Sequence, residues 1–301
     1  MGALETLERQ HSARLGVFAY NTETRASVLY RADERFPMCS VFKTVAVAAV
    51  VRDLDRDGEF LAQVVRYTVA DIDAAGGPGA GPITNRPENL ANGMTVAALC
   101  AAAIQYSDNV AANLLLRELG GPSAVTRFCR SVGDSVTRLD RWEPALNSAE
   151  PGRITDTTTP RAIGGTYGRL TLGRVLDDGD RGLLTGWLLG NTTSGNRFRA
   201  GLPAGWTLAD KTGTGDYGTT NDVGIAWPQG RGPIVLAVLS TRPDDPDAAA
   251  DEPLVAKAAE LLAAALCPQS PDGLDQARDP GVSAVPQNET APRRETRTGT
   301  T

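Results

Sequence analysis

Histidine is almost absent from this chain of 301 residues, in which His11 stands alone within a polar N-terminal segment. A Ser-His-Asp triad needs an imidazole beside the nucleophile, and a catalytic zinc site usually needs two or three. Cysteine is also scarce, and the four cysteines form no CxxC pair and no metal-like spacing. The sequence therefore argues against a histidine-based triad, predicts no metal or other cofactor, and favours buried free thiols.

Long apolar runs and an excess of positive charge are missing as well. The longest apolar run, Val45 to Val51, is far too short to cross a bilayer. The net charge of -6 gives no support to a nucleic-acid partner, which would require a basic face. The N-terminus shows no basic segment followed by an apolar one, so no signal peptide is visible. With 41% hydrophobic residues, the composition is that of an ordinary soluble globular protein without a membrane segment.

Lysine is the rare cation, because only Lys43, Lys211 and Lys257 accompany the arginines among 30 basic residues. A guanidinium stays charged, whereas a buried lysine can lose its proton and act as a base. Lys257 fits the polar face of a surface helix. Lys43 instead lies in an apolar run, three residues after Ser40, so the two side chains share one helix face. Either Lys43 is a badly placed surface residue, or it is a buried amine with a chemical role.

The order of predicted elements indicates an α+β fold. Residues 14–33 alternate around a polar NTET turn and predict a β-hairpin. A helix is expected from Ser40 to about Leu54, and residues 139–159 form a long irregular segment that is typical of a functional loop. Further helices are expected within residues 94–106, 109–119, 121–133, 159–176, 180–191 and 252–266, and strands within 205–213, 220–228 and 233–241.

This order predicts an antiparallel sheet flanked by helices and formed from both ends of the chain, with an inserted all-helical subdomain and the active site at their interface. We expect one domain over residues 1–268. Its sheet part spans about 1–43 plus 191–268, and its helical part about 44–190. Residues 269–301 are rich in proline, glycine and charge, which predicts a disordered tail.

Three further segments carry polar residues that are suited to catalysis. QYSDNVAAN places Ser107 and Asn109 at the junction of two predicted helices. LADKTGTGDY places Lys211 in a predicted strand, and RWEPALN places Glu143 and Asn147 in the long irregular segment. Together with SVFK at Ser40, these segments resemble the S-x-x-K, S-D-N and K-T-G signature of the class A serine β-lactamases. The resemblance covers roughly residues 4–266 and includes an R-x-E-x-x-L-N pattern at residues 141–147.

The resemblance implies acyl transfer from a strained amide to Ser40 as nucleophile, without a cofactor. The base that takes the serine proton is either neutral Lys43 or Glu143 acting through a water, and the sequence supplies both. Glu143 with Asn147 would hold the water that releases the acyl group. Ser107 would relay a proton to the leaving nitrogen, assisted by the charge of Lys211.

The resemblance also assigns the binding residues. The backbone N–H groups of Ser40 and Thr214 would form the oxyanion hole, and Asn109 would bind the substrate's side-chain amide. Because the residue that faces the strand is Thr220 and not an arginine, Arg197 is expected to meet the substrate carboxylate. The remaining implied roles are substrate binding by Thr212, Gly213 and Thr214 beside Lys211, and a structural ion pair between Arg141 and Asp156. By the same analogy, the protein is a monomer that is secreted or periplasmic and acts on a small-molecule β-lactam.

Some positions depart from the family's usual pattern. Cys100 faces the position of Val47, so a disulfide found in many members should be missing. Cys39 should face Gly215, which again leaves a free thiol. The segment from Ala80 to Pro82 lacks the aromatic residue that often borders the cleft, which leaves the substrate profile open.

Three alternative functions use related machinery. A penicillin-binding D,D-peptidase or a β-lactam sensor domain would be acylated but would turn over slowly, and each should lack a working Glu143. A serine esterase with the same Ser-Lys pair is a more distant alternative.

Overall fold

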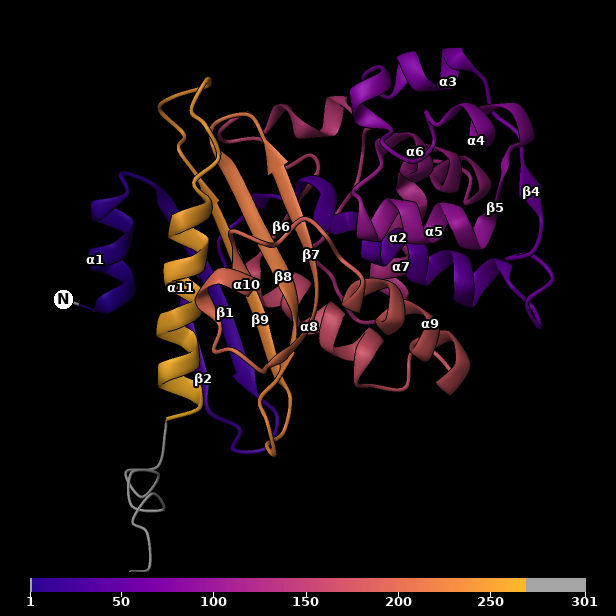
Figure 1. The fold of residues 1–301 in the computed structure, drawn as a ribbon. Coiled ribbons are helices and arrows are strands. Elements are labelled where there is room, and N and C mark those ends of the chain that lie inside the picture. Colours follow the sequence, from indigo (N-terminus) through magenta and orange to yellow (C-terminus); the bar gives the residue numbers. More distant parts are fainter. Residues whose placement is uncertain (1, 269–301) are drawn as a thin grey trace, which may run out of the picture. The chain divides into compact units, whose positions relative to one another are not determined.

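A five-stranded antiparallel sheet organises the molecule, in the order β2-β1-β9-β8-β7 (Figure 1). Its strands are β1 (Arg14–Asn21), β2 (Ser27–Tyr30), β7 (Thr207–Gly215), β8 (Thr219–Trp227) and β9 (Ile234–Thr241). Strand β1 lies between β2 and β9, with Val17 opposite Val238, so both ends of the chain build one sheet. The computed structural model describes residues 2–268, and the tail predicted at 269–301 lies outside the described residues. The α+β prediction is confirmed.

The predicted hairpin is present because the turn between β1 and β2 is held by a side chain. Asn21 Oδ1 accepts hydrogen bonds from the backbone N–H groups of Glu23 (2.9 Å) and Thr24 (3.0 Å). This is the local asparagine turn that competes with regular structure and reverses the chain. The first strand is therefore directed back along the sheet within a few residues.

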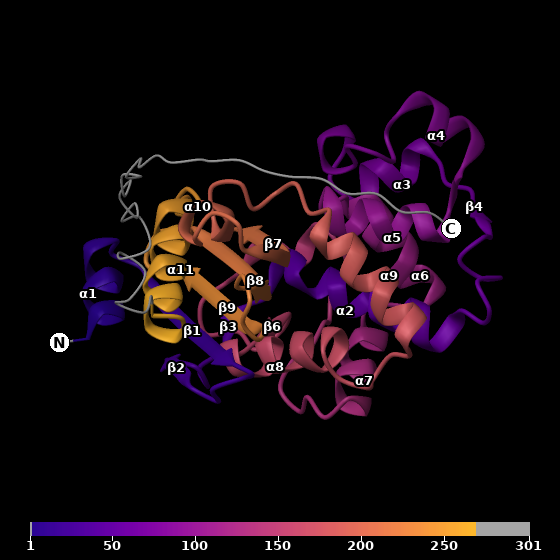
Figure 2. The ribbon, with the colours of Figure 1, turned by 60° about the horizontal axis from the view of Figure 1, so that its bottom comes forward.

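Helices cover both faces of the sheet. On one side lie α1 (Ala3–Gln10) and α11 (Glu252–Leu266), which are seen side by side in Figures 1 and 2. Leu254, Ala258 and Leu262 of α11 are buried against apolar side chains of the strands. On the other side, α8 (Pro160–Thr171) packs on β1, β8 and β9. Helix α1 was not predicted, because its N-cap is Gly2, which offers no capping side chain.

The helical part surrounds α2 (Phe42–Ala49), in which every residue is buried. The helix continues as a π-helical turn over Val50–Leu54, so the predicted helix is present to its predicted end. Around it lie α5 (Val96–Gln105), α6 (Asn109–Glu118), α7 (Ser123–Ser131) and α9 (Asp178–Leu189). Smaller elements are β4 (Val64–Val65), α3 (Val69–Ala74), α4 (Pro87–Asn92), β5 (Met94–Thr95) and α10 (Phe198–Gly201).

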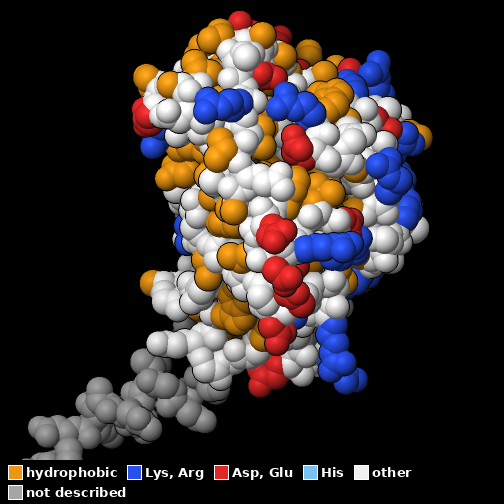
Figure 3. Space-filling view, turned by 90° about the vertical axis from the view of Figure 1, so that its right-hand side faces the viewer, with side chains coloured by type: hydrophobic (Ala, Val, Ile, Leu, Met, Phe, Trp, Pro, Cys, Tyr) orange, Lys and Arg blue, Asp and Glu red, His pale blue; other side chains and the backbone are white. Residues whose placement is uncertain are grey.

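The irregular segment 139–159 is a loop with two short ordered pieces. A 3-10 turn spans Ala145–Ser148, and β6 (Thr157–Thr158) pairs with β3 (Phe36–Pro37) just before Ser40. The loop is therefore tied to the segment that carries Ser40. Figure 3 shows the face of the helical part, where acidic, basic and apolar side chains are interspersed. Within residues 2–268, no helix combines the length and the apolar character that a bilayer crossing requires.

Candidate active site

Ser40 lies where a 3-10 turn, Cys39–Val41, leads into α2. The chain enters this turn through Cys39, whose positive φ of 46° is uncommon for a non-glycine residue. The side-chain amide of Asn221 on β8 fixes the approach by donating to the carbonyl groups of Pro37 (3.0 Å) and Met38 (3.1 Å). Ser40 is thus anchored to the sheet while its helix runs into the core of the helical part.

Lys43 is fully buried, and its three shortest contacts are with acceptor atoms. Its Nζ donates to the carbonyl of Ser107 at 2.7 Å and to Oδ1 of Asn109 at 2.6 Å, and it lies 3.1 Å from Oε1 of Glu143. An ammonium group carries three protons, and each of these three acceptors can receive one of them. Of the two sequence interpretations, the structure shows the buried amine and not the surface residue.

Glu143 is also buried, and its carboxylate reaches Ser40. Oε1 lies 3.4 Å from Oγ of Ser40, and Oε2 accepts a 2.5 Å hydrogen bond from Asn147. The backbone of Glu143 is fixed by Asn113 on α6, which donates to its carbonyl (2.9 Å) and accepts from its N–H (3.0 Å). Asn113 lies outside the sequence motifs and was not predicted. The available signal was its spacing of four from Asn109, which places both on one face of α6.

Ser107 stands between two lysines. Its Oγ lies 3.0 Å from Nζ of Lys211 and 3.4 Å from Nζ of Lys43. Burial and the positive charges of Lys43 and Arg197 hold the pKa of Lys211 well below its ordinary value. The lowered pKa lets Lys211 give up a proton readily, which suits a proton relay through the Ser107 hydroxyl group.

Arg197 is buried beside β7. Its Nη2 donates to Oγ1 of Thr214 at 2.7 Å, and its Nη1 donates to the carbonyl of Gly213 at 3.0 Å. Nε forms an ion pair with Glu252 at 3.1 Å. Thr214 pairs with Thr220 in the ladder, so the facing position does hold the threonine that the sequence indicated. The guanidinium is therefore placed beside β7, the strand that carries Lys211.

The predicted ion pair at the base of the loop is present. Arg141 Nε contacts Oδ2 of Asp156 at 2.5 Å, and the backbone N–H groups of Asp140 and Arg141 donate to Oδ1. Asp156 is buried, and its carbonyl accepts from the N–H of Met38 at 2.9 Å. The pair therefore joins the two ends of the loop and connects them to the segment before Ser40.

All four cysteines are free. Cys39, Cys100 and Cys129 are buried, and burial raises the pKa of the Cys39 thiol. A Cβ atom placed on Gly215 would lie 2.7 Å from Sγ of Cys39, which confirms that these two residues face each other. The same Cβ would lie 2.6 Å from the carbonyl oxygen of Asn147, so β7 and the loop touch at this glycine.

This contact predicts the effect of Gly215→Ala. The added methyl group must displace the Asn147 backbone or the thiol, which should lower the free energy of unfolding by about 1–3 kcal/mol. Because Asn147 holds Glu143, release of the acyl group should also slow. Urea unfolding and steady-state turnover check both effects. Gly195→Ala is the matched control, since its Cβ would meet nothing within 4 Å; equal losses in the two variants would contradict the prediction.

Two buried carboxyl groups, Asp210 on β7 and Asp222 on the neighbouring strand β8, interact with each other. Burial and the charge of Asp210 raise the pKa of Asp222 well above its ordinary value. In the unfolded chain an aspartate titrates near pH 4 (about 3.9). The stability that protonated Asp222 contributes is therefore fully present below about pH 4 and is lost as pH rises toward its folded-state pKa.

Asp222→Asn should consequently gain stability relative to the wild type between pH 5 and pH 8. Urea unfolding of both proteins at the two pH values measures this difference. Asp33→Asn serves as the control, because Asp33 pairs with Arg161 at the surface and this pairing lowers its pKa. A difference in the free energy of unfolding between wild type and Asp222→Asn that stays constant with pH would contradict this interpretation.

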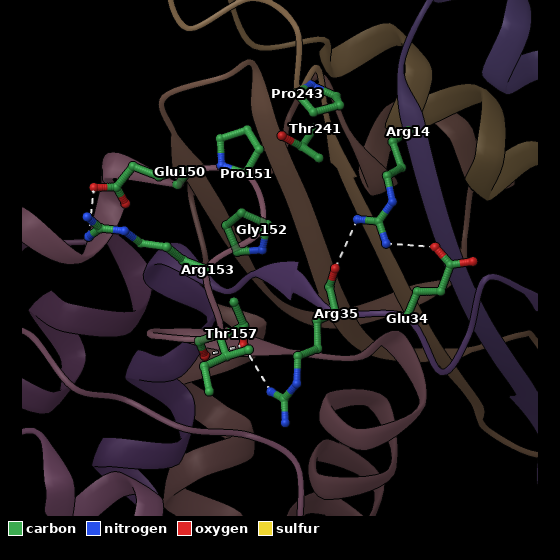
Figure 4. Close-up of a pocket in the computed structure, with 13 residues that line it drawn as sticks. Arg14, Glu34, Arg35, Glu150, Pro151, Gly152, Arg153, Thr157, Thr241 and Pro243 are labelled. Carbon is green, nitrogen blue, oxygen red and sulfur yellow. Dashed lines mark hydrogen bonds and ion pairs between the residues drawn. The ribbon is translucent and has the colours of Figure 1, made fainter.

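A cavity of about 390 Å³ lies elsewhere, between the loop residues 149–154 and the ends of β1 and β9. Figure 4 shows Pro151 and Gly152 on one side of it and Arg14, Thr241 and Pro243 on the other. None of the motif residues lines this cavity. In the described part of the chain, no group of His, Cys, Asp and Glu side chains could hold a metal ion. The buried hydrogen-bonded cluster around Ser40, and not this cavity, is thus the candidate active site.

Comparison with known proteins supports the same assignment. Residues 2–266 match the family described as the Beta-lactamase enzyme family. A β-lactamase from Streptomyces lavendulae is 69% identical over 263 residues, which cover 87% of this chain and 85% of that protein. The solved structure of the β-lactamase from Streptomyces albus G has 64% identity and a TM-score of 0.85, covering 87% of this chain and 97% of the other. A β-lactamase structure from Desulfarculus baarsii DSM 2075 has 46% identity and a TM-score of 0.83, covering 88% and 96%. The chain belongs to the beta-lactamase enzyme family.

Proposed function

We propose that this protein hydrolyses the amide bond of β-lactam antibiotics through an acyl-enzyme on Ser40, and so confers resistance to them. One observation carries the proposal: Ser40 Oγ, Lys43 Nζ and Glu143 Oε1 form one buried cluster with separations of 3.4 and 3.1 Å. A serine beside a buried base supports nucleophilic attack without histidine. The reaction class is that of a hydrolase acting on cyclic amides.

Of the two candidate bases for acylation, the geometry favours Glu143. All three protons of the Lys43 ammonium have acceptors, so neutral Lys43 would leave one acceptor unmatched. The Glu143 carboxylate is held in place by Asn147 and by Lys43. Glu143 would therefore take the serine proton through a water and later activate the water that releases the acyl group.

The oxyanion would be bound by the N–H groups of Ser40 and Thr214. Strand β7 passes so close to the serine that a Cβ on Gly213 would lie 3.3 Å from the Ser40 nitrogen. A glycine there lets the strand approach, which is the geometry that two converging backbone donors need. Ser107 would pass a proton to the leaving nitrogen with Lys211 behind it.

The substrate carboxylate would meet Lys211, Thr212 and the Thr214 hydroxyl group that Arg197 supports. A carboxylate is bound best by charged donors, and Arg197 brings its charge within one hydrogen bond of Thr214. Asn109 turns its Oδ1 to Lys43, so its amide nitrogen can donate to a carbonyl group on the substrate side chain. We further infer that the enzyme acts as a monomer outside the cytoplasmic membrane, as the family resemblance implies.

A chromogenic cephalosporin in large excess over the wild-type protein tests this function. We expect sustained opening of many equivalents, because Glu143 is in place to release each acyl group. Opening that stops near one equivalent would indicate a sensor domain or a D,D-peptidase. No opening would redirect the search toward ester substrates.

A further inference from the structure

The hydroxyl group of Thr212 is hydrogen-bonded to a side chain that lies outside the sequence motifs. Its Oγ1 lies 2.5 Å from Oγ1 of Thr193, in the segment between α9 and α10. Thr193 in turn contacts Oδ1 of Asn191 through its hydroxyl (2.8 Å) and its backbone N–H (3.0 Å). Asn191 Nδ2 donates to Oδ2 of the buried Asp210 at 2.9 Å. We call Asn191, Thr193 and Thr212 the hydroxyl relay.

The direction of these hydrogen bonds follows from the fixed ends. Asn191 Nδ2 is bound to a carboxylate and its Oδ1 receives a backbone N–H, so Oδ1 can only accept. In the free protein the Thr193 hydroxyl therefore donates to Asn191. Its single proton is then used, and the 2.5 Å contact is made by Thr212 donating to Thr193. Thr212 consequently presents only lone pairs to a ligand in the cleft.

A carboxylate needs the opposite orientation, because it accepts hydrogen bonds and is repelled by lone pairs. If both hydroxyl groups rotate, Thr193 donates to Thr212 and Thr212 donates to the carboxylate. Asn191 Oδ1 still keeps the backbone N–H of Thr193. Each polar side-chain atom of the relay then has a partner both with and without the ligand, which avoids the cost of an unsatisfied group.

We propose that Thr193 is a positioning residue for the substrate carboxylate, acting through Thr212 by this reversal of the hydroxyl relay. The proposal rests on the proposed function, since it takes the carboxylate of a β-lactam as the ligand of Thr212. Thr193 does not touch the reacting atoms, so it should affect substrate binding and leave the chemical steps unchanged. Uniform binding of this kind appears in KM and not in kcat.

A double-mutant cycle with benzylpenicillin tests the relay. Thr193→Val keeps the shape of the side chain and removes its hydroxyl, so KM should rise about threefold to tenfold, the effect of one neutral hydrogen bond, while kcat stays within about twofold. In the Thr212→Val background the same substitution should change KM by less than about twofold, because no hydroxyl is left to act on. Thr193→Ser should restore the wild-type KM.

The outcomes separate the relay from the function beneath it. Equal losses from Thr193→Val in both backgrounds, or a loss that Thr193→Ser does not restore, would show a structural role and overturn the relay alone. Thr193→Ala repeats the cycle if the valine variant does not fold, as judged by its melting temperature. A wild-type protein that opens no β-lactam would overturn the proposed function and with it the relay.

Discussion

Glu143→Ala is expected to open about one equivalent of a chromogenic cephalosporin and then stop. The carboxylate lies 3.4 Å from the Ser40 hydroxyl group. Asn147 holds the carboxylate, and two hydrogen bonds with the Asn113 side chain hold the Glu143 backbone. Without it, no group in this cluster is placed to activate water against the acyl-enzyme. General-base catalysis contributes about 10²–10⁴ in rate, so steady-state turnover should fall by about a hundredfold to ten-thousandfold. Mass spectrometry of the stalled protein should show one added acyl group on Ser40.

The rate of the first equivalent identifies the acylation base. If Glu143 takes the serine proton, the burst measured by stopped flow should itself be slower than in the wild type. A burst at the full wild-type rate would assign that proton to Lys43 and leave Glu143 only the release step. Glu150→Ala removes a carboxylate from the same loop, where it contacts Ser148 and Arg141, and should lose less than about tenfold in turnover.

Lys43→Met should abolish acylation, with kcat/KM lower by about a thousandfold or more. Methionine has a similar length but no charge and no protons. The Ser107 carbonyl, Asn109 and Glu143 would lose the donor they share, and Glu143 would be left buried without its counter-charge. The carboxylate would also lose the contact that holds it beside Ser40, so acylation and release of the acyl group should fail together.

Single-turnover kinetics with mass spectrometry measures this effect, because no acyl-enzyme should form within the normal turnover time. Lys257→Met is the matched control. Lys257 is exposed on α11 and pairs with Glu260 at 2.8 Å, so its replacement should leave turnover unchanged. Acylation of Lys43→Met at the wild-type rate would remove the lysine from the mechanism.

The sequence allowed the fold and the principal site to be predicted where the signals are local. The NTET turn fixed the hairpin, and the apolar run after Ser40 predicted a helix that proved wholly buried. The four motifs predicted side chains that the fold brings together around Ser40, because the expected chemistry demands those residue types. Helix α1 was not predicted, because it has only eight residues and its N-cap, Gly2, has no capping side chain.

The residues that support the site were not predictable in the same way. Asn113 and Thr193 are ordinary polar residues in sequence, and their roles depend on which loop or strand the fold brings against them. Asp222 is similar, since its environment is set by Asp210 from the neighbouring strand. A pattern in one chain can indicate that a residue is polar inside a helix or strand, but not which partner it will meet.

Because β1 pairs with β9, the protein can reach its folded form only after most of the chain has been synthesised. Asn21, at the end of β1, bonds to the carbonyl of Leu266 across 245 positions of sequence. Ser40 and Lys43 emerge early from the ribosome, yet the strand that carries Lys211 and the helix that closes the sheet emerge near the end. Contacts this distant in sequence form slowly, because the chain loop between them must first be closed. Ser40 is therefore synthesised early, but the residues that complete its site reach it only at the end, so a partly synthesised chain has no assembled active site.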